Sequence, residues 1–172
     1  SVINGDAEPK MRDEIERFRM SQDSVGGVIE CAAIGLPVGV GGNMFDTVES
    51  KLASILFGVP AVKGVEFGLG FGFADKNASS VNDGYEIKDG RVALLSNNNG
   101  GVLGGMTTSA PIIVSAVIKP TPSISQEQRS VNLQTMTNET LVIKGRHDPC
   151  RVPLAVPVIE AAVALGLLDL MI

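Results

Sequence analysis

The spacing of apolar residues predicts two amphipathic helices in the first third of the chain. Residues 9–20 carry apolar side chains every three or four positions, with charged residues between them, and Pro9 suits a first helical turn. A second helix is expected to follow from Asn43 and to end at Gly58. Its apolar face would consist of Phe45, Val48, Leu52 and Ile55.

Runs of apolar residues predict the strands, which would cover residues 28–34, 62–67, 112–118 and 140–143. Residues 85–95 predict a hairpin, because Asp89-Gly90 is a favoured pair for a tight turn. A last helix is expected to begin near Pro157 and, being apolar nearly all round, to lie in the core. Helices and strands alternate without a regular βαβ repeat. The pattern therefore predicts an α+β layered fold, with residues 1–172 as a single domain.

Composition excludes several classes of protein. The chain is 44% hydrophobic and only 19% charged, which is too apolar for a disordered protein, and its net charge of −5 argues against nucleic-acid binding. Two cysteines cannot form a disulfide framework and the first ten residues are polar, so we expect a cytoplasmic protein. Glu160 and Asp169 lie in the apolar last 21 residues, which predicts a buried helix and no membrane span.

Three glycine-rich segments, residues 39–42, 68–72 and 97–105, could bind a phosphate. None has the spacing of a P-loop or of a dinucleotide fingerprint, and each alone is more typical of a turn that requires positive φ. Residues 97–105 differ in degree, because four glycines and three asparagines in nine residues allow close approach to a flat or anionic ligand.

Residues 119–123 follow an apolar strand and contain two prolines that hold an extended backbone. Lys119, Thr121 and Ser123 would then project from a stiff edge toward phosphate or carbonyl oxygens. A linker that ends the strand explains the same residues.

The segment Arg146-His147-Asp148-Pro149-Cys150 has the densest set of reactive groups. Zinc binding is a poor explanation, since the chain has one histidine and two cysteines in all, and we expect no metal site. We interpret Arg146 as an anion ligand and Asp148 as a group that orients it or exchanges a proton. Asp148 before Pro149 is also typical of a helix cap, and spacing alone leaves both readings open.

Several motifs together resemble those of chorismate synthase. They occur in that family's order across residues 23–172, and the resemblance is to its C-terminal half; residues 1–22, a leading helix and linker, match more weakly. The matching blocks are residues 23–27, Phe45-Asp46, Lys51-Leu52-Ala53, residues 60–68, Asn82-Asp83, residues 97–105, residues 119–123 and residues 145–150.

The resemblance implies a lyase of the shikimate pathway, which leads to the aromatic amino acids. Such enzymes convert 5-enolpyruvylshikimate 3-phosphate to chorismate and phosphate and require reduced FMN, with NADPH as the reductant in some members. They have a layered β-α-β sandwich and form homotetramers in the cytoplasm. The residues implied to bind flavin are Ala61, Gly104, Lys119, Pro120, Thr121, Pro122, Ser123 and Arg146, and Asp148 matches a catalytic aspartate proposed to tune proton transfer.

The chain also departs from the family pattern. Members are longer, and their first half carries a pair of catalytic histidines that His147, the only histidine here, does not replace. Pro60 stands where many members have asparagine. We therefore expect a fragment with an incomplete active site that is inactive by itself. The alternative is a non-catalytic flavin-binding or interaction module on the same scaffold.

Overall fold

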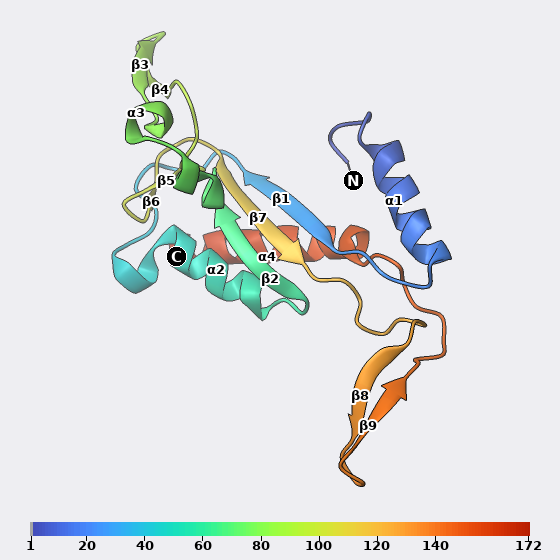
Figure 1. Cartoon of the computed structure of the whole chain (residues 1–172). Coiled ribbons are helices and arrows are strands. Elements are labelled where there is room, and N and C mark those ends of the chain that lie inside the picture. The colour runs from blue at the N-terminus through green and yellow to red at the C-terminus, as the bar shows by residue number, and fades with distance from the viewer. Residues whose placement is uncertain (1) are drawn as a thin grey trace. The chain divides into compact units, whose positions relative to one another are not determined.

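The structure, a computed structural model, describes residues 2–172 (Figure 1). The chain divides into two compact units. The first unit consists of the residues up to 27 together with 118–155, and the second of 28–117 and 156–172. Helices and strands are mixed in both units, which confirms the predicted α+β class. The assignment of a single domain stays a prediction.

A three-stranded sheet forms the centre of the second unit. Its order is β1 (Gly27–Ala33), β7 (Ile112–Ile118), β2 (Val62–Phe67), and all three strands lie within one residue of the ranges predicted from the apolar runs. Along β7, Ile112, Val114 and Ala116 are buried, whereas Val117 on the opposite face is exposed. The sheet therefore has one core-facing side.

Two helices pack together in the second unit: α2 (Val48–Gly58) and the greater part of α4 (Val152–Met171). Leu52 and Leu56 of α2 and Ile159 and Val163 of α4 are almost fully buried. Each such side chain stabilises the fold by about 1.5–3 kcal/mol. Gly166 allows the close approach of the two helices, because a Cβ there would lie 2.7 Å from Leu52 Cδ2.

The helix predicted from Asn43 begins later than expected. Residues Met44–Asp46 form a separate 3-10 turn, and Thr47 is extended and caps α2 by accepting a hydrogen bond from the amide of Ser50. Phe45, assigned to the apolar face, is 83% exposed, so that assignment is wrong. Gly58 is the last residue of α2, as predicted.

Helix α4 begins at Val152, five residues before the predicted start, and contains Pro157. One face is buried, whereas Leu165 and Leu168 are exposed, so the prediction of a core helix holds for one face only. By length and composition the helix could cross a membrane. It also carries Asp169, which forms an ion pair with Lys51 of α2.

The predicted hairpin is confirmed as β3 (Tyr85–Lys88) and β4 (Arg91–Leu94), with positive φ at both turn residues, Asp89 and Gly90. A shorter hairpin, β5 (Val102–Leu103) and β6 (Met106–Thr107), lies within and after the glycine-rich residues and was not predicted. A 3-10 helix η2 (Gly70–Asp75) and the short α3 (Ala78–Val81) connect β2 to β3.

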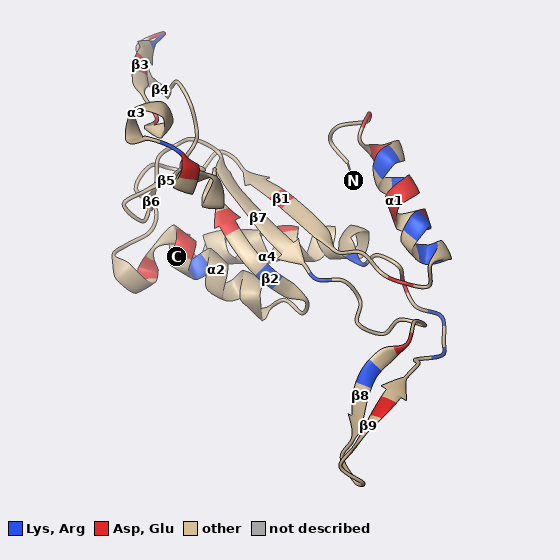
Figure 2. Ribbon diagram, in the orientation of Figure 1, with Lys and Arg blue, Asp and Glu red and all other residues tan. Residues whose placement is uncertain are grey.

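The first unit contains α1 (Glu8–Met20), which confirms the first predicted helix. Its charged residues are conspicuous in Figure 2, and three pairs, Glu8–Arg12, Glu14–Arg17 and Glu16–Arg19, form exposed ion pairs along it. The strand predicted at 140–143 is instead β9 (Thr137–Leu141), paired with β8 (Gln128–Asn132). Strand β8 was missed because its sequence, QRSVN, is mostly polar.

Candidate functional site

In the first unit, residues 21–27 hold together the two segments that the sequence singled out. The hydroxyl of Ser24 donates to the carbonyl of Thr121 (2.7 Å, buried), and the amide of Val25 donates to the carbonyl of Pro149 (2.8 Å). These bonds place residues 119–123 and 146–150 on either side of one short stretch of chain. Ser24 lies inside a matching motif, residues 23–27, but the sequence alone indicates no role for its hydroxyl.

Gly26 is needed for this arrangement. A Cβ at this position would lie 2.3 Å from the carbonyl oxygen of Ile118 and 3.1 Å from Pro120 Cδ, so no other residue fits without moving the backbone. The start of the proline-containing segment is therefore fixed by direct contact with Gly26. A packed segment of this kind argues against a loose linker at 119–123.

Thr121 is the buried member of that segment. It is 8% exposed, and its hydroxyl has no hydrogen-bond partner among the described residues. Lys119, Pro120 and Pro122 around it are exposed. An unpaired buried hydroxyl costs free energy unless a ligand supplies an acceptor or donor, so Thr121 marks a place where a polar ligand group would be stabilised.

His147 has a local structural role. Its Nε2 lies 3.2 Å from the carbonyl oxygen of Ile143, and this contact closes the turn over Gly145. Arg146 beside it is exposed and makes no ion pair within residues 2–172. The turn thus leaves the guanidinium free for an anion while the imidazole is engaged with the backbone.

Asp148 is exposed, and its carboxylate lies 3.8 Å from Nε of Arg151. Helix α4 starts at Val152, and two amides of its first turn, those of Leu154 and Ala155, donate to the carbonyl of Arg151. Asp148 therefore does not cap this helix, and that alternative is wrong. The connection between β9 and α4 that carries Asp148 is rich in basic residues, namely Lys144, Arg146 and Arg151 (Figure 2).

In the second unit, a network centred on Asp83 shapes residues 97–105, hereafter the Asn–Gly loop. One carboxylate oxygen accepts from Ser96 Oγ (2.6 Å) and the Asn98 amide (2.7 Å). The other accepts from the amide (3.0 Å) and the side-chain Nδ2 (2.8 Å) of Asn99. Burial by itself would raise the pKa of Asp83, but these hydrogen bonds outweigh it and lower the pKa to about 2.

The Asn–Gly loop touches backbone on two sides. A Cβ at Gly100 would lie 2.4 Å from the amide of Gly68, and a Cβ at Gly101 would lie 2.4 Å from the carbonyl of Pro111. Gly100 also pairs with Ile113, whose amide donates to its carbonyl (3.1 Å). These glycines are therefore used for packing against protein and leave no room there for a ligand.

Gly104 differs from those glycines. It is exposed at the turn between β5 and β6, has φ +60°, and has nothing within 4 Å of the position of a Cβ. Gly105 beside it is packed against Thr47 and accepts from the amide of Val48 at the start of α2. Gly104 is thus an open backbone surface held in place by its neighbour.

Ala61, the other predicted flavin residue of this unit, lies elsewhere. It has φ +73° and follows the end of α2, whereas Gly104 lies by the start of that helix. Eleven helical residues span about 16 Å at 1.5 Å per residue. The second unit therefore does not bring Ala61 and Gly104 together.

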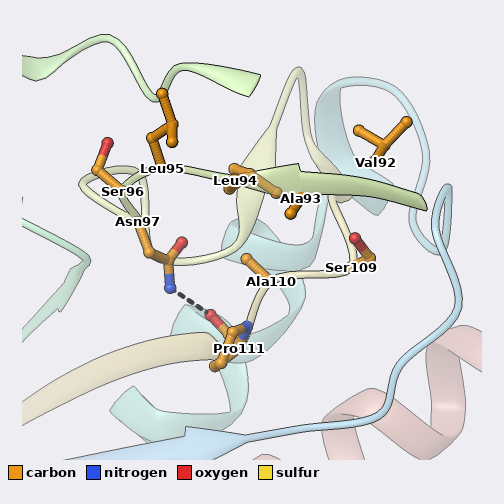
Figure 3. Close-up of a pocket in the computed structure, with 9 residues that line it drawn as sticks. All are labelled: Val92, Ala93, Leu94, Leu95, Ser96, Asn97, Ser109, Ala110 and Pro111. Atoms are coloured by element: carbon orange, nitrogen blue, oxygen red, sulfur yellow. Dashed lines mark hydrogen bonds between the residues drawn. The ribbon is translucent and has the colours of Figure 1, made fainter. Parts of the chain in front are cut away.

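A shallow hollow of about 410 Å³ lies beside the Asn–Gly loop (Figure 3). Its walls are formed by residues 92–97 and 109–111, none of which is charged. On one side the Asn97 side chain donates to the carbonyl of Pro111 (2.8 Å), as the dashed line shows. Without a cation, the hollow is a poor place for a phosphate. None of the predicted flavin-binding or catalytic residues lines it, and of the Asn–Gly loop it includes only Asn97.

Two further features bear on reactivity. Burial raises the pKa of the Cys31 thiol, with Glu160 adding to the effect, so this cysteine is a weak nucleophile. Among residues 2–172, no three His, Cys, Asp or Glu side chains gather as metal ligands. The predicted site residues thus fall into two groups. Residues 119–123, 146 and 148 lie in the first unit, and Ala61 and Gly104 lie in the second.

Comparisons with known proteins support one family. A family model described as chorismate synthase matches residues 1–172. The chorismate synthase of Thermococcus kodakarensis is 52% identical over 159 residues, which is 92% of this chain and 45% of that relative. That of Dehalococcoides mccartyi strain BAV1 is 49% identical over 156 residues, 91% of this chain and 43% of the relative.

A solved crystal structure of chorismate synthase resembles this structure with a TM-score of 0.75 at 29% identity, covering 95% of this chain and 42% of that one. The chain therefore spans less than half the length of the relatives that it matches. Because the family model matches residues 1–172 throughout, this chain belongs to the chorismate synthase family.

Proposed function

We propose that this chain contributes the flavin-binding and proton-transfer residues of a chorismate synthase, which converts 5-enolpyruvylshikimate 3-phosphate to chorismate and phosphate. The observation that carries the proposal is the buried, unpartnered hydroxyl of Thr121, in a segment fixed by Ser24 and Gly26. Lys119, two residues before it, is exposed, and Ser123, two residues after it, is partly buried. Because the chain belongs to the chorismate synthase family, we interpret this hydroxyl as a ligand of the flavin.

The residues present fit reduced FMN. The cofactor combines an anionic phosphate with a flat ring that carries carbonyl and N–H groups. Lys119 and Arg146 supply exposed cations for the phosphate or for an anionic substrate, and Thr121 supplies a hydroxyl without a protein partner in residues 2–172. Gly104 belongs to the second unit and has exposed backbone with no side chain in the way. Its contact with the flavin is what the family resemblance implies. The role of Ala61, at the other end of α2, stays a prediction.

The reaction breaks the C3–O bond, so that phosphate leaves, and removes a proton from C6, with no net redox change. When bound, reduced FMN supplies electron density as the phosphate departs. Arg146 and Lys119 bind and orient anionic groups. Asp148 would exchange the proton: its carboxylate is exposed, and its contact with Arg151, at 3.8 Å, is loose and leaves the oxygens accessible.

Two further parts of the proposal follow from the family. The complete enzyme is expected to be a cytoplasmic homotetramer, with NADPH as a source of reducing equivalents for the flavin in some members. The 172-residue chain by itself is expected to give no turnover, because it spans 45% of the Thermococcus kodakarensis enzyme and its only histidine bonds to the carbonyl of Ile143. A non-catalytic flavin-binding module is the alternative for the chain alone.

The decisive experiment compares Asp148→Asn with the wild type in the full-length gene product, with reduced FMN and substrate. The carboxamide keeps the shape but cannot exchange a proton at neutral pH. We therefore expect a fall in kcat of about 10²–10⁴-fold, with FMN affinity within a few-fold of wild type. Arg151→Gln, which removes the ion-pair partner and leaves the carboxylate, is the matched control and should retain most activity. An active Asp148→Asn enzyme would remove Asp148 from the mechanism, and a wild type without turnover would refute the proposed function.

A further inference from the structure

Asp83 is the most heavily hydrogen-bonded side chain of the second unit. Its two oxygens accept four hydrogen bonds, from Ser96 and from three N–H groups of Asn98 and Asn99, at 2.6–3.0 Å. The side chain is half-buried and lies in the connection between α3 and β3, 13–16 residues before the groups it binds. The proposed function gives this carboxylate no role.

All four groups around Asp83 donate hydrogen bonds, so the side chain at this position must offer four acceptor positions, as an ionised carboxylate does. Two of the donors are backbone amides at the entrance of the Asn–Gly loop, which turns immediately afterwards through positive φ at Gly100 and Gly101. An anion among converging amides stabilises such a turn in the way that a bound anion occupies a nest of backbone N–H groups. The low pKa of Asp83 agrees with a carboxylate that stays ionised at all physiological pH values.

The loop continues directly into the hairpin that carries Gly104. The Gly101 amide donates to Asn97 Oδ1 (2.7 Å), and the Gly101 carbonyl accepts from the amide of Thr108 (3.0 Å), just after β6. The path from the carboxylate to the exposed turn thus passes only through residues 97–108. These hydrogen bonds connect the loop entrance to the base of the β5–β6 hairpin.

We infer that Asp83 is a positioning residue for the cofactor: it holds the Asn–Gly loop in the one shape that presents the open backbone of Gly104 to the flavin. The inference rests on the proposed function, since it assumes that Gly104 contacts FMN. Asp83 itself does not touch the cofactor, because its accepting positions are occupied by Ser96 and by the loop residues Asn98 and Asn99.

The test uses Asp83→Asn in the full-length gene product. An amide has one accepting oxygen and one donating nitrogen, so in either orientation at least one backbone amide, that of Asn98 or that of Asn99, would face a donor. We expect the dissociation constant for FMN to rise by about 10- to 100-fold, the scale for groups that support a binding residue. We also expect the amides of residues 96–101 to exchange hydrogen faster in the absence of flavin.

Two controls separate positioning from general stability. Asp75→Asn changes an exposed carboxylate of η2 that makes no hydrogen bond or ion pair within residues 2–172, and should leave FMN affinity within about twofold. Val163→Ala removes two methyl groups from a buried position of α4, distant in sequence from Asp83. It is expected to lower the melting temperature without weakening FMN binding.

The outcomes are distinct. The inference would be overturned if Asp83→Asn bound FMN, or exchanged the amide hydrogens of residues 96–101, like wild type. It would also be overturned if Val163→Ala, at a melting temperature equal to that of Asp83→Asn, lost the same FMN affinity. A wild-type protein that does not bind FMN would refute the proposed function instead, and the inference with it.

Discussion

Removing the hydroxyl of Thr121 is predicted to weaken FMN binding without lowering the stability of the ligand-free chain. A buried, unpaired polar group costs about 1–3 kcal/mol, so Thr121→Val, which keeps the shape, should leave the melting temperature of the ligand-free chain unchanged or raised. The same change removes a group that a ligand would use, and FMN affinity should fall about tenfold, a loss of about 1.4 kcal/mol. Thermal melts and flavin titration measure the two effects.

Thr108→Val is the matched control, because Thr108 Oγ1 is the other buried hydroxyl without a partner in residues 2–172 and is not at a predicted flavin position. The melting temperature of the Thr108→Val protein should likewise be unchanged or raised, and its FMN affinity should equal that of wild type. A Thr121→Val protein that binds FMN like wild type would mean that this hydroxyl does not face the cofactor.

Asp83 also predicts a pH dependence of stability. Its pKa is about 2 in the folded chain against 3.8 for an unperturbed aspartate, so its contribution is fully present above about pH 5 and is lost as the pH falls toward 2. The loss should be about 1–2 kcal/mol, since the carboxylate is partly exposed and solvent screens it. Urea unfolding of wild type and Asp83→Asn between pH 7 and pH 3 measures it. The variant should be less stable at pH 7 and should lose less on acidification; parallel curves would contradict the prediction.

At the scale of elements, the parts that sequence could predict are those with a local signal. The apolar runs of β1, β2 and β7 and the Asp89-Gly90 turn encode their own structure, so these elements were placed to within a residue. Strand β8 has no such signal, because its polar residues are held by pairing with β9. Phe45 has the spacing expected of the apolar face of α2. The helix begins only at Val48, however, because Thr47 caps it, so Phe45 lies outside the helix despite its spacing.

The turn of the β5–β6 hairpin yields a prediction with a matched partner. Gly104 and Gly90 both sit in hairpin turns with positive φ, +60° and +73°, and at neither would an added Cβ have an atom within 4 Å. Alanine at either position should therefore cost a similar backbone strain, about 1 kcal/mol. Only Gly104→Ala should weaken FMN binding, because only that turn is proposed to face the flavin. Equal affinity in the two variants, measured by flavin titration, would place Gly104 outside the site.

At the scale of the whole chain, the sequence motifs identified the candidate residues, but not what positions them. Ser24, Gly26 and Asp83 each act across more than ten residues of sequence, through a carbonyl, a close backbone approach and four donors respectively. Such roles depend on which segments the fold brings together, and a linear motif contains no record of that. The same limit explains why the sequence could not show that Ala61 and Gly104 lie by opposite ends of α2.

The exposed side of α4 leads to a prediction about assembly. In the second unit, Val158, Leu165 and Leu168 are exposed at helical spacing, with Ile172 next along the same stripe. A contiguous apolar stripe in water favours association, and the chain spans only 45% of the length of the Thermococcus kodakarensis relative. We therefore expect the 172-residue chain to form dimers or larger oligomers at micromolar concentrations, as seen by light scattering with size-exclusion chromatography.

Substituting charged residues on the exposed apolar side of α4 tests whether this surface forms the contact between copies of the chain. Leu165→Glu with Leu168→Glu should shift the chain toward monomer, because burying two carboxylates in an apolar contact is costly. Met11→Glu with Met20→Glu, which adds the same charge to exposed positions of α1, should leave the oligomer intact. A monomeric wild-type chain, or dissociation by both pairs of substitutions alike, would show that the exposed side of α4 does not hold the copies together.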